Sequence, residues 1–227
     1  MFIDVYYLYL VIPALLFSLW AQYTVKTTFK KYSTVQSRRG ITGAETARLL
    51  LASNLIPDVI IEQTAGSLTD HYDPGHKRIR LSKKVYASAS LAAIGVAAHE
   101  TGHALQHAQA WPGLAARSYL LPVASVGSTM GPYIALAGIF FGFPLLSDIG
   151  IFLFAGAVAF YIITLPVEFN ASHRAITLLK SNGILSATEL QGVQKVLSAA
   201  ALTYVASAVT SIAGFVRLLL LSRNRQR

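Results

Sequence analysis

The chain contains no cysteine, and this absence excludes both a disulfide framework and a metal site built on thiolates. Charged residues are also scarce: they make up 13% of the 227 residues, whereas 54% are hydrophobic. Soluble domains carry about 25% charged residues, so this composition indicates a membrane protein. Any bound metal must be held by histidine and carboxylate side chains.

Acidic residues are few as well, ten against 19 basic ones, which gives a net charge of +9. Such a balance can indicate nucleic-acid binding. The lysines and arginines form no arginine-rich or aromatic-interleaved stripe, however, and many flank apolar runs, where they act as topology determinants. We therefore expect a lipid bilayer as partner and no nucleic acid.

Four apolar tracts are candidates to cross that bilayer. A hydrocarbon core of about 30 Å requires about 20 apolar residues in a helix. Tracts of this kind occupy residues 5–23, 118–141, 149–167 and 196–221. The first is interpreted as an uncleaved anchor, because Asp4 stands where a signal peptide carries a base, and bulky residues replace a cleavage site. The expected fold is mainly α, a multi-pass helical bundle of about four membrane spans.

The basic residues also predict the topology. Fifteen of the 19 lie between residues 26 and 195, in the segments that join the first tract to the second and the third to the fourth. The positive-inside rule places both segments in the cytoplasm. Four complete crossings would then put the basic C-terminus outside, against that rule. Either Arg217 snorkels from the last tract, or that tract does not cross fully.

Residues 24–112 have the pattern of a mixed, soluble catalytic region. Thr42 and Glu45 form a capping box, which predicts a helix near residues 43–54. A long helix is expected at residues 90–110.

Two short strands are expected before that long helix, at residues 58–63 and at residues 78–82 (RIRLS). If RIRLS is an exposed edge strand, it could bind an extended peptide by β-augmentation. A polar loop at residues 69–76 separates the strands. Its side chains of metal-ligand type are Asp70, His71, Asp73 and His76. They could hold a second metal, although a turn with local hydrogen bonds explains the same residues.

The long helix carries HETGH at residues 99–103, which is the motif H-E-x-x-H. Residues four apart lie on one face of a helix, so the imidazoles of His99 and His103 can bind one Zn²⁺. Glu100 is rotated by about 100° from His99. It therefore reaches the open coordination position, where it can act as general base on water.

His107 continues the series of histidines at intervals of four. On a straight helix it lies about 12 Å from His99, too far for both to bind one ion. We expect His107 to be a surface residue or a hydrogen-bonding partner of a ligand.

Glu168 is the expected third ligand. No other acidic residue lies between Asp148 and Glu189, and a carboxylate at the end of an apolar tract is costly unless it is paired or binds a metal. The hairpin of the second and third tracts returns the chain to the membrane face of the H-E-x-x-H helix. The alternative is an interfacial glutamate paired with Arg174.

Two histidines and one glutamate with an open position are the arrangement of a catalytic zinc site. Such a site needs a donor for the oxyanion that develops during hydrolysis. His173 and Arg174 are the candidates, and each could equally be a base that flanks the membrane.

Several segments together resemble the YugP-type family of membrane zinc metallopeptidases. They are AAHETGHALQH, GSLTDHYDP, RIRLS and LPVEFNASHRA, and the resemblance extends over about residues 3–222. That family belongs to the gluzincins, as do the HtpX-type membrane proteases. The combination is far more specific than H-E-x-x-H alone.

The resemblance implies a zincin-like catalytic domain that holds a small β element, with a metal-ligand helix and turn at residues 168–195. It implies one zinc ion on His99, His103 and Glu168, with Glu100 as general base. It also implies peptide-bond hydrolysis and residence in a prokaryotic membrane.

One position departs from the HtpX-type pattern, in which an aspartate follows the ligand glutamate by four residues. Here that position is Ser172, and Asn170 is neutral as well. The hydrogen-bonding partners of the ligands are therefore unassigned; Asp70 or Asp73 could supply one through space.

The sequence predicts a membrane-embedded zinc endopeptidase that cleaves membrane or membrane-proximal proteins with a zinc-activated water. Its active site is expected on the cytoplasmic side of a prokaryotic cytoplasmic membrane. The alternative is a non-enzymatic scaffold or chaperone with a structural zinc site, but such a site is closed by a fourth ligand and has no use for Glu100. A zinc hydrolase of a non-peptide bond is a third reading. Neither the substrate nor the oligomeric state follows from the sequence.

Overall fold

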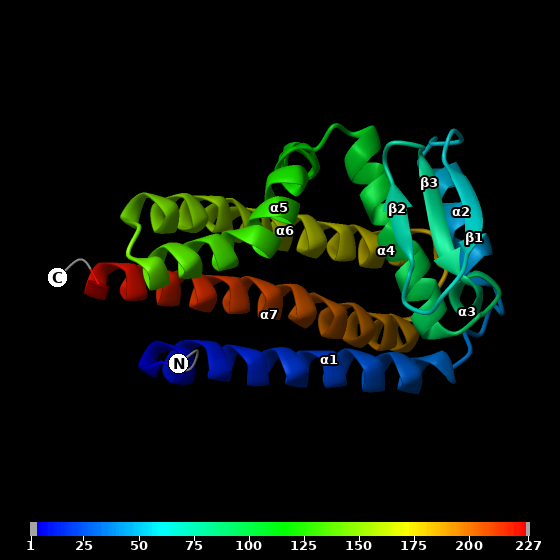
Figure 1. The fold of residues 1–227 in the computed structure, drawn as a ribbon. Helices are drawn as coiled ribbons and strands as arrows, with labels where there is room; N and C mark the ends of the chain where they lie inside the picture. The colour runs from blue at the N-terminus through cyan, green and yellow to red at the C-terminus, as the bar shows by residue number, and fades with distance from the viewer. Residues whose placement is uncertain (1–3, 226–227) are drawn as a thin grey trace. The chain divides into compact units, whose positions relative to one another are not determined.

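The computed structural model describes residues 4–225 (Figure 1). Its elements are the short π-helix η1 (Tyr7–Val11), α1 (Ile12–Ser33), α2 (Gly43–Ser53), β1 (Ile60–Thr64), β2 (His71–Asp73), β3 (Arg78–Ser82), α3 (Lys83–Tyr86), α4 (Leu91–Ala108), α5 (Pro112–Phe141), α6 (Pro144–Ser181) and α7 (Ala187–Arg225). Helices dominate, and the described residues contain one three-stranded sheet. The predicted mainly α fold with a small β element is confirmed.

The chain forms two compact units. The first, here called the helical unit, comprises Met1–Gln22, Ala116–Pro166 and Leu202–Arg227. The second, the mixed unit, comprises Tyr23–Ala115 and Val167–Ala201. The unit boundaries fall inside α1, α5, α6 and α7, so each of these helices contributes residues to both units.

Four helical stretches among the described residues are long and apolar enough to cross a membrane. They are Tyr7–Ser33, Pro112–Phe141, Pro144–Ser181 and Ala187–Asn224. The expectation of about four spans is therefore confirmed. Within the helical unit, α5 and α6 meet at small residues: a Cβ atom on Gly150 would collide with the backbone of Ala135. Small residues at such contacts let membrane helices approach closely.

Arg217, the base inside the last apolar tract, is paired with Asp4 in the helical unit. Its Nε and Nη2 atoms donate to Asp4 Oδ2 at 2.9 and 2.7 Å, and its guanidinium lies 5.1 Å from the ring centroid of Tyr7. Burial raises the pKa of Asp4, but the hydrogen bonds from Arg217 and from the Tyr7 N–H outweigh burial and hold this pKa below its usual range. This ion pair lowers the free-energy cost of an arginine in an apolar tract.

Breaking this pair should destabilise the helical unit. The side chains of Arg217 and Asp4 are only 12% and 22% exposed. Asp4→Asn removes the negative charge that Asp4 places beside the guanidinium, and we expect a loss of about 2 kcal/mol, between the values for exposed and fully buried pairs. Thermal unfolding in detergent measures this loss. Asp148→Asn, at an exposed acid of the same unit, is the matched control; equal melting temperatures for the two variants would contradict the prediction.

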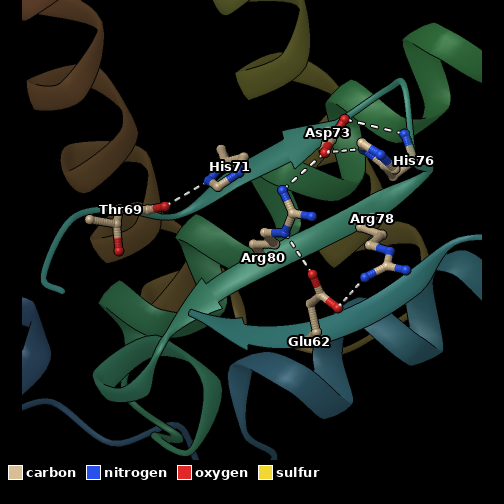
Figure 2. A network of polar contacts seen from close by, with 7 residues as sticks. All are labelled: Glu62, Thr69, His71, Asp73, His76, Arg78 and Arg80. Atoms are coloured by element: carbon tan, nitrogen blue, oxygen red, sulfur yellow. Dashed lines mark hydrogen bonds and ion pairs between the residues drawn. The ribbon is translucent and has the colours of Figure 1, made fainter. Parts of the chain in front are cut away.

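The sheet of the mixed unit has the strand order β1-β3-β2, with β3 parallel to β1 and antiparallel to β2. Alternate residues of β3 point to opposite faces. Ile79 and Leu81 are fully buried in a core with α2 and α4. The opposite face is charged: Arg80 donates to Glu62 at 2.6 Å and to Asp73 at 2.9 Å (Figure 2).

The prediction that RIRLS could be an exposed edge strand is wrong. RIRLS is β3, and it is paired on both sides. The strand that covers its second edge is β2, which lies in the segment expected to be a polar loop. β2 has only three residues, His71–Asp73, too few for a recognisable alternation of polar and apolar residues. Binding of a peptide to RIRLS by β-augmentation is thereby excluded.

The polar residues around β2 form local hydrogen bonds. Asp73 accepts a bond from the His76 N–H and lies 2.8 Å from His76 Nδ1, while His71 Nδ1 lies 2.8 Å from the carbonyl of Thr69 (Figure 2). Asp70 accepts a hydrogen bond from the Ser82 N–H at 2.7 Å. These contacts match the interpretation as a turn rather than a second metal site, and within residues 4–225 no metal-ligand group includes these side chains.

The capping box that the sequence predicts at Thr42 is present, and α7 begins with a second one. Thr42 Oγ1 accepts from the Glu45 N–H at the start of α2, and the Glu45 carboxylate accepts from the Thr42 N–H. Ser186 and Glu189 make the same pair of bonds at the start of α7. The reciprocal bonds satisfy backbone donors that the first helical turn leaves free.

Candidate metal centre

Helix α4 carries the H-E-x-x-H motif in the interior of the mixed unit. It begins after Ser90, whose hydroxyl accepts a hydrogen bond from the Ala93 N–H. Small side chains, among them Ala97, Ala98 and Ala104, are fully buried along the helix. They allow neighbouring elements to pack close to its backbone.

Gly102 of the motif marks the closest approach to α6. A Cβ atom at this position would lie 2.5 Å from the carbonyl oxygen of Ala171, so only glycine fits. Glu168 lies on α6, three residues before Ala171. α6 is continuous from Pro144 to Ser181, so the segment that begins at residue 168 is the continuation of a long helix and not a separate one.

The close approach brings the Glu168 carboxylate to the two motif histidines. Glu168 Oε2 lies 3.2 Å from His99 Nε2 and 3.6 Å from His103 Nε2. The three residues each offer one ligand atom, and these atoms all lie within 4.8 Å of one another. Glu168 is only 2% exposed. Three donors that converge at such distances are suited to hold one metal ion.

Each imidazole is also held on the side away from Glu168. His99 Nδ1 lies 3.1 Å from Ser172 Oγ, and His103 Nδ1 lies 2.9 Å from Gln106 Oε1. Both Nδ1 atoms are thus occupied by protein groups, and both Nε2 atoms face Glu168. The described residues therefore fit a metal site of two histidines and one glutamate.

The sequence did not identify these hydrogen-bonding partners. The suggestion that Asp70 or Asp73 supplies one is wrong, because Asp70 bonds to Ser82 and Asp73 bonds to His76 and Arg80. A signal was present nonetheless: Ser172 follows Glu168 by four residues, and positions four apart share a helix face.

The comparisons with known proteins agree with this geometry. The family described as "Putative neutral zinc metallopeptidase" matches residues 7–223. The chain belongs to this family. It is 48% identical over 218 residues to "Putative membrane protease YugP" of Bacillus subtilis (strain 168), which covers 96% of this chain and 97% of that relative. No solved structure matches. The resemblance that the sequence indicates is confirmed.

Glu100 is 7% exposed and follows the first histidine directly on α4. The negative charge of Glu100 raises the pKa of His103. Burial lowers the pKa of the His103 imidazole, but the hydrogen bond to Glu168 and the charges of Glu100 and Glu168 outweigh burial and raise this pKa above its usual range. Two carboxylates thus act on the same imidazole, which creates a negative environment suited to a cation.

His107 lies outside the group of metal-ligand side chains. Its Nδ1 atom is 2.8 Å from the hydroxyl of Tyr72 on β2. Burial and the charges of Asp58 and Asp73 raise the pKa of Tyr72 to about 12, so the phenol stays neutral. His107 therefore links α4 to the sheet.

The two candidate oxyanion donors differ in their surroundings. His173 is exposed on α6. Arg174 donates from Nε to Asn170 Oδ1 at 2.7 Å and from Nη1 to Gln109 Oε1 at 2.6 Å, so its guanidinium is not paired with Glu168. The alternative explanation of Glu168 as the partner of Arg174 therefore fails. The role of either residue at an oxyanion stays a prediction.

Proposed function

We propose that this protein is a membrane-embedded, zinc-dependent endopeptidase that hydrolyses peptide bonds of membrane or membrane-proximal proteins at a single zinc ion. The observation that carries the proposal is the convergence of His99 Nε2, His103 Nε2 and Glu168 Oε2, with Glu100 beside them on α4. The family to which the chain belongs, and the printed name of its relative from Bacillus subtilis, support zinc and proteolysis.

In this proposal each residue has a distinct task. His99, His103 and Glu168 hold the ion, which supplies Lewis acidity at its open position when bound. Glu100 accepts the proton of the attacking water and passes it to the departing amine. His173 and Arg174 are the candidates to stabilise the oxyanion; Arg174 would do so through Nη2, since its Nε and Nη1 are engaged.

We further propose that the site works on the cytoplasmic side of a prokaryotic membrane. The support is the distribution of charge: fifteen of the 19 lysines and arginines lie between residues 26 and 195, and positive segments are retained in the cytoplasm. The mixed unit contains most of this stretch. Substrates would then be cytoplasmic or membrane-proximal polypeptide segments.

The competing function is a scaffold or chaperone with a structural zinc ion. A structural site is closed by four protein ligands, whereas the group among the described residues has three. A structural site also has no use for Glu100, which follows His99 directly on α4 but lies outside the ligand group.

Removal and return of the metal test the proposed function. Full-length protein in detergent, treated with a chelator and dialysed, should lose cleavage of an unfolded or membrane protein substrate, and added Zn²⁺ should restore it. The measurement is the appearance of cleavage fragments together with the zinc content. Persistent cleavage by metal-free protein contradicts the zinc mechanism. A zinc-loaded protein that cleaves nothing in a broad substrate panel favours the scaffold.

A further inference from the structure

The orientation of one buried amide, that of Gln106 on α4, can be assigned from its partners alone. Gln106 is fully buried. One end of its amide lies 2.9 Å from the carbonyl oxygen of Val167. A carbonyl only accepts hydrogen bonds, so that end must be the NH₂ group. The amide oxygen Oε1 therefore faces the imidazole of His103, 2.9 Å from Nδ1.

This orientation fixes the tautomer of His103. An amide oxygen can only accept, so Nδ1 of His103 must carry a hydrogen and donate it. In a neutral imidazole the lone pair then resides on Nε2. Nε2 is the nitrogen that faces Glu168, and a metal can bind only the nitrogen that has the free lone pair.

A second fixed group supports the arrangement. The Gln106 NH₂ also donates to Asn170 Oδ1 at 3.0 Å, and the same oxygen accepts from Arg174 Nε at 2.7 Å. Guanidinium cannot accept, so the Asn170 amide is oriented as firmly as that of Gln106. Gln109 accepts a hydrogen bond from the Arg174 Nη1 atom and is the last, exposed residue of this hydrogen-bond network.

A buried glutamine is costly unless all its hydrogen bonds are made. Here both amide hydrogens and the oxygen are used, and an apolar side chain would fill the same place between α4 and α6 at lower cost. The amide of Gln106 is therefore expected to have a role besides packing. In many metal sites the partner of a ligand histidine is a carboxylate, which makes the ring more basic. Gln106 is neutral, so it orients the ring without adding negative charge.

We propose that Gln106 is a positioning residue that holds His103 in its Nδ1-protonated tautomer, with Asn170 and Arg174 as its support. The inference rests on the proposed zinc function, because it assigns Gln106 a role in metal binding. In this proposal Arg174 has a structural role, because its Nε donates to Asn170 and fixes the amide that contacts Gln106. At the position of the HtpX-type aspartate, Ser172 lies against His99 Nδ1, so neutral groups occupy both Nδ1 positions.

Zinc affinity of two variants of the full-length protein tests the inference. Gln106→Met keeps the length of the side chain but has no acceptor oxygen, and we expect zinc binding about 10–100-fold weaker, the usual effect of losing such a partner. Gln106→Glu restores an oxygen toward Nδ1 and should bind zinc more tightly than Gln106→Met. Gln191→Met, the same change at an exposed glutamine of the mixed unit outside this network, should match wild type. Competition with a chromophoric zinc chelator measures all three.

Melting of the metal-free proteins separates positioning from packing. A glutamine that only joined α4 to α6 would lower the melting temperature in both Gln106 variants, and their zinc affinities would be equal. Equal affinities, or a Gln106→Met protein that binds zinc like wild type, overturn the inference while the zinc function stands. A wild-type protein that binds no zinc overturns both.

Discussion

Glu100→Gln should abolish peptide cleavage and leave the zinc content of the full-length protein unchanged. Glu100 is adjacent to His99, a candidate ligand, but is not part of the converging ligand group. Its amide isostere keeps the size and the buried position while losing the ability to take a proton. General bases contribute about 10²–10⁴-fold to enzymatic rates, so we expect cleavage to fall by at least about 100-fold.

The measurement combines metal analysis with the rate at which fragments of an unfolded or membrane substrate appear. Glu62→Gln, the same change on the charged outer face of the sheet, is the matched control and should cleave at the wild-type rate. Two results contradict the assignment of Glu100. One is wild-type cleavage by Glu100→Gln, and the other is a loss of zinc in parallel with activity, which would make Glu100 a ligand.

Glu168→Ala should remove zinc from the protein. Glu168 contributes the only carboxylate oxygen of the converging group within the described residues, at 3.2 and 3.6 Å from the two histidine nitrogens. Without it, two imidazoles remain, and two ligands hold zinc far more weakly than three. The affinity should fall by more than the 10–100-fold that accompanies loss of an outer hydrogen-bonding partner.

Glu168→Gln adds a second, nearly isosteric variant, because an alanine at a site that is 2% exposed also leaves a cavity. Both variants should lose zinc, and Glu62→Gln should retain it. Metal content after gel filtration, with far-ultraviolet circular dichroism to check folding, decides the outcome. A folded Glu168→Ala protein with full zinc occupancy would refute Glu168 as a ligand.

The two variants also distinguish the candidate functions. The endopeptidase hypothesis requires both zinc and Glu100 for cleavage. It therefore predicts that Glu100→Gln retains zinc but loses cleavage. A structural zinc site predicts that Glu168→Ala lowers the melting temperature while Glu100→Gln changes neither zinc nor any activity. Metal content, stability and cleavage are therefore measured on the same preparations.

Features that depend on a few neighbouring residues were predictable from the sequence. The face shared by His99 and His103 follows from a helix with 3.6 residues per turn, and the four candidate spans follow from long apolar runs. The capping boxes at Thr42 and Ser186 follow from side chains three residues apart. In each of these cases, the residues that interact are close together in the sequence, so a short sequence pattern predicts the structure.

Features that depend on distant residues were decided by the tertiary structure. Ser172 is 73 residues from His99, and Asp4 is 213 residues from Arg217. β3 became a central strand because a three-residue strand, β2, pairs with its second edge. Local spacing can place Ser172 on the helix face of Glu168, but it does not specify which remote group each polar side chain will contact. The sequence by itself determined the chemistry of the candidate ligands and the apolar helices of the chain. Packing of α4 against α6 decided which remote groups meet the two imidazoles, because only that contact brings Glu168 and Ser172 to them, whereas Gln106 lies on α4 with His103.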